Sequence, residues 1–384
     1  MTRLALTFLV LAATALAQDP TPPSAETAVR ARLQAHLAQH GTSGVCAAYT
    51  SEPGTRVAIA LGVDAAGAVL TDQSQLMSGS IGKTYVAAVA LQLVAEGKLA
   101  LDGKVADVLG KEAWYARLPN ADSVTLRQLL NHTSGIPEHV WKPEFQTAVK
   151  QASDRALGAV ECIGFILGDK AVAPAGERWS YADTNYLLAG LCIERAAGKP
   201  YDAVLRARIL EPLRLGATQP NDRRAVPGLA CGMASGIGFF EGPVVDKGLY
   251  FTNPAFEGCG GGLRSTALDL AVWMRELSAG DVVPASLRKD HRTGVPVRPG
   301  ATDRYGLGCF VSASPHGEAL GHSGVMPGYL SQAMAYPELR VTVAVMFPTD
   351  AMQKVGNLKQ LCDQIAGDVA GGKGAGAAAE PVRK

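Results

Sequence analysis

The sequence predicts an α+β fold, an α/β sandwich in which one antiparallel sheet is flanked by helices and built from both chain ends. Stretches with strand composition lie near both ends, at 44–50 and 56–63 and again at 305–312, 328–336 and 340–347. The pattern between them is mostly helical, which predicts an inserted, mainly helical subdomain. The simplest packing joins the two ends in one sheet and leaves a cleft against the inserted part.

The composition is typical of a globular protein with a buried core. Of 384 residues, 47% are hydrophobic and 18% charged, and the formal net charge is +1. This balance gives no reason to expect nucleic acid or an anionic membrane as a partner. No residues have the spacing of a metal site or a phosphate-binding glycine loop, so we expect no cofactor and no metal.

The two ends of the chain carry different signals. Residues 1–17 resemble an export signal, with Arg3, an apolar run and a small-x-small cleavage site at Ala15-Leu16-Ala17. We therefore expect a periplasmic or secreted protein without a stable membrane anchor, an uncleaved N-terminal anchor being the alternative. Residues 25–369 are expected to form one module, and the low-complexity residues 370–384 a flexible tail. Within the module, the α/β part is expected at about 25–105 and 300–369 and the helical part at about 106–299.

The individual elements follow from periodicity and turn signals. A first helix is predicted over 25–39, and 44–50 and 56–63 are expected to pair as a hairpin around Ser51-Glu52-Pro53-Gly54. Further helices are predicted at 126–131, 152–167, 185–197, 202–213, 266–278 and 357–369, with Thr125 and Thr266 as caps. Residues 217–262 are glycine-rich and lack periodicity, so we expect a functional loop that contributes to selectivity.

Seven cysteines are present, and none lies in a C-x-x-C pair. In an exported protein they are candidates for disulfides. Cys231 with Cys259, which flank part of the glycine-rich loop, is the first candidate pair, and Cys162 with Cys192 is the second. Because the number is odd, at least one thiol stays free or pairs between chains.

The stretch 76–97 is the centre of the predicted fold. It holds Ser80-Ile81-Gly82-Lys83 and then an apolar run that ends near Gly97. A helix that is apolar nearly all round belongs in the interior, so its polar first turn should open into a cleft. Ser80 would lie at the helix start, where free N–H groups favour negative charge, with Lys83 on the same face. A serine activated by a neighbouring base needs this environment. The spacing alone is weak evidence, because Ser286-Leu287-Arg288-Lys289 repeats it.

Two further elements are expected to meet Ser80 and Lys83 in the cleft. One is Tyr181-Ala182-Asp183, on a loop just before a helix, and the other is His322-Ser323-Gly324, at the edge of a predicted strand. His132, in NHTSG, is expected to have a structural role at a helix end.

With these elements the sequence resembles the penicillin-recognising serine hydrolases of the class C type. That family includes class C beta-lactamases, low-molecular-weight D-alanyl-D-alanine carboxypeptidases and related esterases. The resemblance covers about residues 30 to 368. Its motifs, in family order, are SIGK (80–83), LLNHTSGIP (129–137), YADTNYLLAG (181–190), GGLRSTALDLAVWM (261–274) and GHSGVMPGY (321–329). The resemblance implies a beta-lactamase/DD-peptidase-like fold.

The resemblance also implies roles for the residues. Ser80 would be the nucleophile that forms an acyl-enzyme, and Lys83 and Tyr181 would share the proton transfers. The backbone N–H groups of Ser80 and Val325 would form the oxyanion hole, where each donor is worth about 3 kcal/mol. His322 would take the place of the lysine in the beta-lactamases' K-T-G motif, followed by Ser323 and Gly324.

Two residues depart from the family pattern. His322 in place of Lys offers a neutral donor whose ordinary pKa of about 6.5 would make binding sensitive to pH. Asp183 stands where Asn is common, and its charge should hold Lys83 as an ammonium. We therefore expect Tyr181 to be the principal base and Lys83 to act electrostatically.

The expected function is that of a serine hydrolase, D-Ala-D-Ala carboxypeptidase-like or esterase-like. The substrate would be a small molecule or a peptidoglycan peptide. A class C-type beta-lactamase is an alternative, less favoured because of His322. A non-catalytic module that binds peptidoglycan peptides is another, although such a module has no need of Ser80, Lys83 and Tyr181 together. Sequence leaves the oligomeric state open.

Overall fold

The computed structural model describes residues 24–376 apart from Pro53 and residues 236–239. The export signal predicted at 1–17 lies outside the described residues, as do the last eight residues of the predicted tail. No helix in the described part of the chain is long and apolar enough to cross a membrane.

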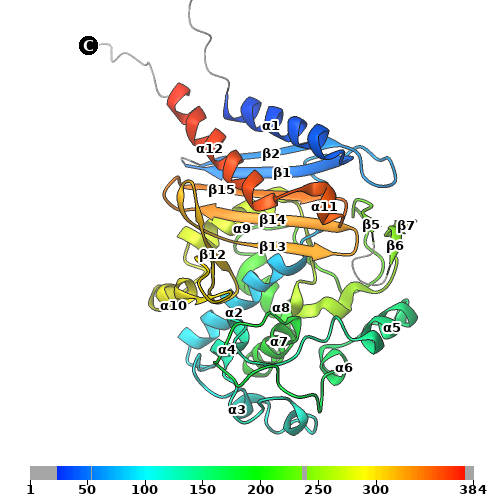
Figure 1. Ribbon diagram of the computed structural model, residues 1–384, viewed down its shortest axis with the longest axis vertical. Coiled ribbons are helices and arrows are strands. Elements are labelled where there is room, and N and C mark those ends of the chain that lie inside the picture. The colour runs from blue at the N-terminus through cyan, green and yellow to red at the C-terminus, as the bar shows by residue number, and fades with distance from the viewer. Residues whose placement is uncertain (1–23, 53, 236–239, 377–384) are drawn as a thin grey trace, which may run out of the picture.

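An eight-stranded sheet forms the centre of the molecule (Figure 1). Its strand order is β10-β11-β12-β13-β14-β15-β1-β2, and every neighbouring pair is antiparallel. The strands are β1 Gly44–Ser51, β2 Thr55–Gly62, β10 Val295–Pro296, β11 Arg304–Tyr305, β12 Phe310–Ser314, β13 Gly317–Met326, β14 Tyr329–Tyr336 and β15 Val341–Phe347. The N-terminal β1 pairs with the C-terminal β15, Cys46 opposite Met346. Both chain ends therefore build one sheet, which confirms the predicted fold class.

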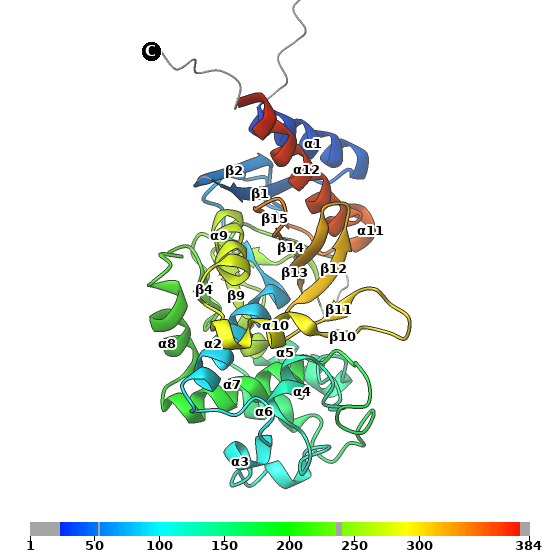
Figure 2. The same cartoon turned by 90° about the vertical axis from the view of Figure 1, so that its left-hand side faces the viewer.

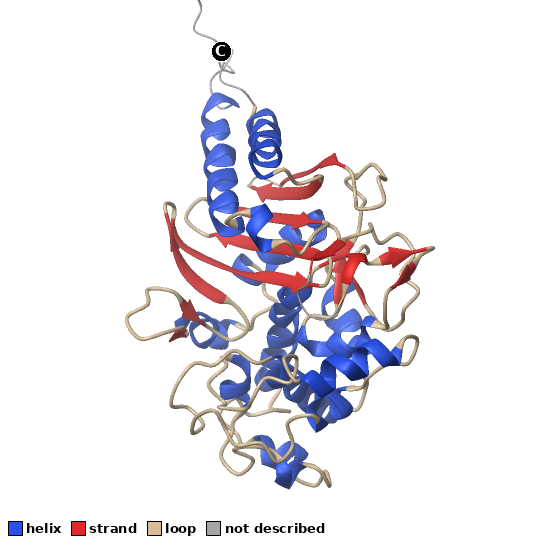
Figure 3. Ribbon diagram, turned by 45° about the vertical axis from the view of Figure 1, so that its right-hand side comes forward, coloured by secondary structure: helices blue, strands red, loops and turns tan. Residues whose placement is uncertain are grey.

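Helices cover both faces of this sheet. On one face lie α1 (Ala25–His40) and α12 (Leu358–Gly376), which run side by side at the top of Figure 3. On the other face lies α9 (Ala267–Ala279), as Figure 2 shows. Alternate residues of β15 point to opposite faces of the sheet. Val343 packs in the hydrophobic cluster under α1 and α12, and Ala344 packs in the cluster on the α9 side. Because helices cover both faces of the sheet, nearly every side chain of β15 is apolar, and its sequence is a continuous apolar run rather than an alternating one.

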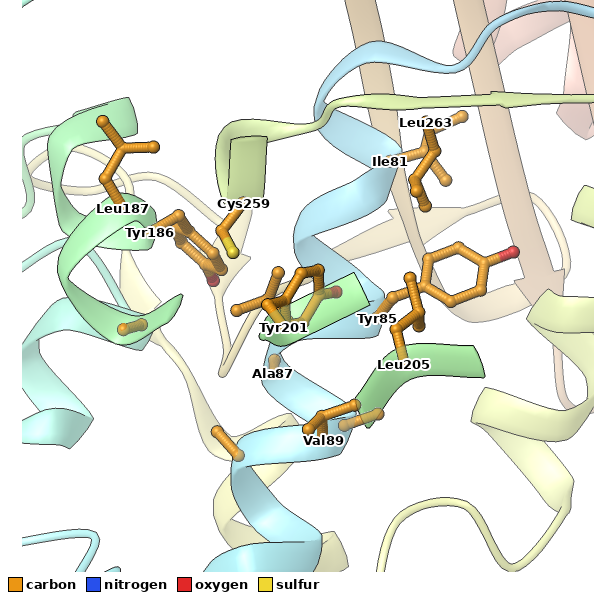
Figure 4. Close-up of a cluster of buried hydrophobic side chains, with 14 of the residues drawn as sticks. Ile81, Tyr85, Ala87, Val89, Tyr186, Leu187, Tyr201, Leu205, Cys259 and Leu263 are labelled. Carbon is orange, nitrogen blue, oxygen red and sulfur yellow. The ribbon is translucent and has the colours of Figure 1, made fainter. Parts of the chain in front are cut away.

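Helix α2 (Gly82–Ala95) passes through the middle of the core, preceded by the 3-10 turn η1 (Gly79–Ile81). Figure 4 shows its side chains packed against helices of the inserted part, with Tyr201 and Leu205 close to it. The ring of Tyr85 stacks on that of Trp273, with centroids 3.9 Å apart. Ten consecutive residues from Gly82 are buried, which confirms the predicted interior helix.

The inserted part consists of short helices and small strands, which form two pairs (β5-β6 and β7-β8) and a three-stranded sheet (β3-β9-β4) with β3 from before α2. Its helices are α3 Val105–Leu109, α4 Leu126–Leu130, α5 Pro143–Ala152, α6 Ala159–Gly164, α7 Asp183–Ala197 and α8 Tyr201–Leu205, which continues as a π-helical turn, η3 Arg206–Leu210. Shorter helical pieces are η2 Tyr115–Arg117, η4 Pro254–Gly260, η5 Ala285–Leu287 and α10 Arg288–Thr293, and α11 Met352–Val355 follows β15 outside the inserted part. The small strands are β3 Leu76–Met77, β4 Gln219–Pro220, β5 Met233–Ser235, β6 Glu241–Pro243, β7 Val245–Asp246, β8 Leu249–Tyr250 and β9 Leu263–Ser265.

Several predicted boundaries differ from the structure. The single helix predicted at 152–167 is wrong: α5 ends at Ala152, Ser153 takes a positive φ of 50°, and α6 begins only at Ala159. The ten-residue β13 was not predicted as a strand. Its glycines interrupt the alternation of apolar and polar side chains that marks a strand. Glycine is required at position 321, because a Cβ at Gly321 would lie 2.2 Å from a carbonyl oxygen of β14. Helix α12 continues beyond residue 369 to Gly376, into the expected tail.

Both candidate disulfides are wrong, since all seven cysteines are free and buried. Cys259 packs instead against α7, where a Cβ at Gly190 would lie 2.3 Å from its sulfur. The thiol of Cys162 donates to the carbonyl of Phe256, and that of Cys231 to the carbonyl of Val245. Each sulfur therefore has its own surroundings in the core, where a thiol behaves as a small apolar group.

Candidate active site

Ser80 lies in η1, between β3 and α2, at the junction of the sheet and the inserted part. Ser78, the residue before η1, is held by hydrogen bonds on two sides. Its N–H donates to the carbonyl of Leu263 at 2.9 Å, and its own carbonyl accepts from the hydroxyl of Ser331 at 2.7 Å. Strands β9 and β14 thus set the position of the turn that carries Ser80.

Glycines allow two backbone segments, one at Gly324 and Val325 and one at Gly261, to approach this turn. Gly79 has φ +53°, and a Cβ there would lie 2.5 Å from the backbone nitrogen of Val325. A Cβ on Gly261 would lie 2.8 Å from the nitrogen of Ser80, and one on Gly324 would lie 1.8 Å from the carbonyl oxygen of Ser78. Only glycine permits such close contact. The turn that carries Ser80 and the segment that carries Val325 therefore approach each other closely.

Lys83 is fully buried one turn below Ser80. Its ammonium donates to the Ser80 hydroxyl at 2.9 Å, donates to the carbonyl of Gly260, and pairs with the carboxylate of Asp183. Burial lowers the pKa of Lys83, but the negative charge of Asp183 outweighs burial and raises it. Lys83 is therefore an ammonium in the resting site, as predicted from Asp183.

Tyr181 packs beside this ammonium, with the Lys83 nitrogen 5.0 Å from its ring centroid. Burial raises the pKa of Tyr181, opposed by the positive charge of Lys83 and by hydrogen bonds with Lys83 and Ser80. The phenol is thus protonated at rest. This limits the expected role of Tyr181 as principal base, because its phenolate is only a minor form.

His132 supports Tyr181 from behind, their ring centroids 4.1 Å apart. Its Nδ1 accepts from the backbone N–H of Ala182 and from the side-chain amide of Asn185, both at 3.2 Å. Burial, followed by the charge of Lys83, lowers its pKa far below the ordinary value, so the ring is neutral. The structural role expected for His132 therefore lies in holding the loop before α7 rather than in satisfying a helix end.

His322 lies in β13 with 1% of its surface exposed. Its Nδ1 is 2.5 Å from the carbonyl of Ser323, so Nδ1 donates, and its Nε2 then accepts from the hydroxyl of Tyr305 at 2.9 Å. Burial, followed by the charge of Lys83, lowers the pKa of His322 to about 3. The expectations of a free donor and of pH-sensitive binding near pH 6.5 are therefore wrong, because both nitrogens are engaged and the ring stays neutral.

A pocket of about 290 Å³ opens above Ser80, between the sheet and the inserted part. Six of the eight predicted site residues line it, and Lys83 and Gly324 lie beneath. The lining residues are Ser80, Val140, Trp141, Tyr181, Asp183, Phe256, Glu257, Phe310, His322, Ser323, Val325, Met326, Pro327 and Met352. Most are apolar, and among the described residues no arginine or lysine lines the pocket. The predicted cleft thus exists, and 217–262 contributes Phe256 and Glu257 to its wall.

Sequence reasoning missed two carboxylates near Asp183, those of Glu138 and Glu257. Glu138 accepts from the backbone N–H of Asp183 at 2.5 Å and of Val140 at 3.0 Å, and it contacts His139 at 3.1 Å. Glu257 belongs to η4 and lines the pocket. Glu138 follows the NHTSG motif by a few residues, a signal that could have placed it near the site. Glu257 lies in an aperiodic stretch that gave no such signal.

Comparison with known proteins agrees with this geometry. The Beta-lactamase family model matches residues 29–359. Penicillin-binding protein 4* of Bacillus subtilis (strain 168) is 27% identical over 278 residues, which are 69% of this chain and 58% of that protein. Penicillin-binding protein 4 of Amycolatopsis lactamdurans is 35% identical over 149 residues, 39% of this chain and 37% of that protein. The chain therefore spans less than two thirds of the length of these curated relatives.

Solved structures match over more of the chain. A D-stereospecific amidohydrolase from Streptomyces sp. is 29% identical with a TM-score of 0.75, covering 86% of this chain and 96% of that one. The D-amino acid amidase from Ochrobactrum anthropi SV3, complexed with L-phenylalanine amide, shares the fold, with 22% identity, a TM-score of 0.77, and coverage of 91% and 99%. Because the family model matches most of the chain, this protein belongs to the Beta-lactamase family of serine hydrolases.

Proposed function

We propose that this chain hydrolyses small esters or amides through an acyl-enzyme on Ser80. The observation that carries the proposal is the 2.9 Å hydrogen bond between the Lys83 ammonium and the Ser80 hydroxyl, beside Tyr181 and at the floor of a pocket. A serine hydroxyl is inert at its own pKa and reacts only when neighbouring groups take its proton.

In the proposed reaction the phenolate form of Tyr181 accepts the proton of Ser80 as Oγ attacks the substrate carbonyl. The Lys83 ammonium favours that phenolate, since its charge lowers the pKa of Tyr181. Tyr181 then returns the proton to the leaving group. Water afterwards attacks the acyl-enzyme, and Ser80 recovers its proton by the reverse route.

The backbone N–H groups of Ser80 and Val325 are the proposed oxyanion hole. Their closeness supports this assignment, because Gly79 lets the two segments meet. Each donor directed at the oxyanion stabilises the transition state by about 3 kcal/mol. Ser323 is exposed and precedes Val325 by two residues on β13, so its hydroxyl is the proposed contact to the outer part of the substrate.

The charges of the pocket favour a substrate that lacks a carboxylate next to the scissile bond. Binding a terminal carboxylate requires a cation or several donors, whereas His322 is neutral and both its nitrogens are engaged. Apolar walls from Phe256, Trp141 and Phe310 suit a hydrophobic acyl group. Since the two structural relatives are named for D-amino acid amides or D-stereospecific hydrolysis, D-configured amino-acyl amides and esters are the first compounds to test.

D-Ala-D-Ala carboxypeptidase-like activity is the second candidate. It is supported by two curated relatives that are named penicillin-binding proteins. The same resemblance keeps beta-lactam hydrolysis within the proposal as a lesser activity. We also propose export through residues 1–17, and N-terminal sequencing of the protein from expressing cells tests that point.

Intact-protein mass spectrometry after rapid mixing tests the proposal. The panel is a p-nitrophenyl ester, D-phenylalanine amide, a D-Ala-D-Ala peptide and benzylpenicillin, each with wild type and Ser80→Ala. We expect acyl adducts from the ester and the amide on wild type only, with turnover. A long-lived adduct from penicillin alone would favour the carboxypeptidase-like candidate. Adducts on Ser80→Ala, or no adduct and no turnover with any compound, would contradict the acyl-enzyme.

A further inference from the structure

Three carboxylates, those of Asp183, Glu138 and Glu257, interact with one another beside the buried ammonium of Lys83, and two of them have partners within the protein. Asp183 pairs with Lys83 itself. Glu138 accepts two backbone hydrogen bonds, from Asp183 and Val140, and contacts the ring of His139. Both oxygens of Glu138 are therefore satisfied within the protein, and the charge of Asp183 is balanced by that of Lys83.

The third carboxylate, Glu257, makes no hydrogen bond and no ion pair within the described residues. It is 9% exposed, and its side chain lines the pocket above Ser80. Its turn is held firmly, because Asn253 caps η4 and the carbonyl of Phe256 accepts from the thiol of Cys162. Glu257 is thus nine-tenths buried and faces a cavity without a partner. Burying a carboxylate in this way destabilises the protein unless a ligand supplies a hydrogen bond or an opposite charge.

The position of Glu257 relative to the reacting atoms follows from Gly260. The carbonyl of Gly260 accepts from the same Lys83 ammonium that contacts Ser80. A Cβ on Gly260 would lie 3.4 Å from Glu257 Oε1 and 3.6 Å from the Cβ of Asp183. Glu257 therefore lies on the side of the pocket that holds Lys83 and Asp183, and it lines the same cavity as the reacting Ser80.

The charges around Glu257 favour a cation in the pocket. Asp183 and Glu138 are negative, Lys83 is the positive group near them, and the other groups that interact with Glu257, Tyr250 and Cys162, are neutral. Burial, followed by the charge of Asp183, raises the pKa of Glu257 to about 8. A cation bound beside Glu257 would lower this pKa again, because an opposite charge favours the ionised carboxylate.

We propose that Glu257 recognises a positively charged amino group on the acyl part of the substrate, close to the scissile carbonyl. The substrate class is then a compound with a free amino group and a hydrophobic side chain, such as an amino acid amide or ester, rather than an N-acylated peptide. This inference rests on the proposed function, since it uses the same pocket and the same nucleophile. Glu257 acts here as a specificity residue and takes no part in the proton transfers.

A matched pair of esters tests the inference. D-phenylalanine p-nitrophenyl ester carries the amino group, and 3-phenylpropionic acid p-nitrophenyl ester is the same compound without it. The readout is the ratio of kcat/KM for the two esters in wild type, Glu257→Gln, Glu257→Asp and Glu144→Gln. Glu144 is exposed in the first turn of α5 and serves as the control for the same chemical change. Circular dichroism of each variant establishes that it is folded.

We expect wild type and Glu144→Gln to favour the amino ester by at least ~10-fold, from the gain of a buried charge-assisted hydrogen bond. Glu257→Gln should bring the ratio close to one, and Glu257→Asp should keep part of the preference. Phenethylamine, a cation without a scissile bond, should inhibit wild type competitively and inhibit Glu257→Gln about tenfold more weakly.

The outcomes separate the inference from the proposed function. Hydrolysis of both esters at equal rates by wild type would overturn the role of Glu257 and leave the acyl-enzyme on Ser80 standing. An undiminished preference in folded Glu257→Gln would overturn it equally. Failure of both esters to acylate Ser80 would overturn the two proposals together.

Discussion

The ammonium of Lys83 and the carboxylate of Asp183 form an ion pair directly beneath the hydroxyl of Ser80. The lysine is fully buried, and the aspartate side chain is 18% exposed. Because burial alone would drive Lys83 toward the neutral amine, Asp183 determines its charge state. Asp183 also raises the pKa of Tyr181. One residue therefore influences the pKa of both groups proposed to handle the proton of Ser80.

Replacing Asp183 with Asn should consequently move the pH–rate profile toward lower pH. Loss of the negative charge lowers the pKa of Tyr181 and that of Lys83. We expect the rising limb of kcat/KM to shift down by at least about one pH unit, which corresponds to about 1.4 kcal/mol. Steady-state rates with the best ester between pH 5 and 10 give the profile. A profile identical to that of wild type, or one displaced to higher pH, would contradict this role of Asp183.

Replacing Gly79 with Ala should abolish most activity. The added methyl group would lie 2.5 Å from the nitrogen of Val325, and φ is +53°, so the two proposed oxyanion donors must separate. A displacement of about 1 Å at a catalytic group costs on the order of 100-fold in rate, and we expect a loss of that size in kcat/KM. Gly216→Ala is the control, since its Cβ would meet no atom within 4 Å. Retention of more than a tenth of the activity by Gly79→Ala would argue against this arrangement of donors.

The buried histidines should make the protein sensitive to acid. Burial holds the pKa of His322 at about 3 and that of His291 at about 4. The unfolded chain takes up these protons below about pH 6.5, so stability is present above that pH and falls as the pH drops toward 4. Urea unfolding at pH 7.5 and pH 5 should show a loss of ~2 kcal/mol per histidine. In His322→Gln the loss should be smaller by one such contribution, and an unchanged loss would contradict the assignment.

All seven thiols should be free and unreactive in the native protein. Burial raises the pKa of Cys46, Cys162, Cys192 and Cys309 to about 12, which suppresses the reactive thiolate. Ellman's reagent should therefore label almost none in the native state and seven in denaturant. Dithiothreitol should leave Tm unchanged. Fewer than seven thiols in the denatured, unreduced protein would reinstate a disulfide.

Much of the site was predictable because its residues occur in motifs that each element displays locally. Ser80 and Lys83 stand at the start of a helix that is apolar all round, and that pattern alone requires burial. The charge of Asp183 also allowed the state of Lys83 to be predicted before any geometry was known.

Other features depend on contacts between distant segments, and no local pattern shows them. The neutral state of His322 follows from its burial and from the charge of Lys83, and its Nε2 is engaged by Tyr305, which lies on another strand. Strand β13 was hidden by Gly321 and Gly324, which are present for close packing rather than for strand propensity. The predicted cysteine pairs are wrong for the same reason, since the separation of two cysteines in the sequence does not determine the distance between their sulfur atoms in the core.

Glu257 gives a final prediction that concerns stability rather than specificity. The pKa of its carboxyl is raised to about 8 from an ordinary 4.5. The folded protein therefore holds a proton that the unfolded chain releases, and this contribution to stability is lost as the pH rises from about 4.5 to about 8. Glu257→Gln has no such proton to lose. The difference in unfolding free energy between variant and wild type should grow by ~2–4 kcal/mol in favour of the variant between pH 5 and pH 9. Thermal and urea unfolding at both pH values measure it, with Glu144→Gln as the control that shows no change. A difference that does not vary with pH would mean that Glu257 is ionised in the folded protein throughout this range and would contradict the raised pKa.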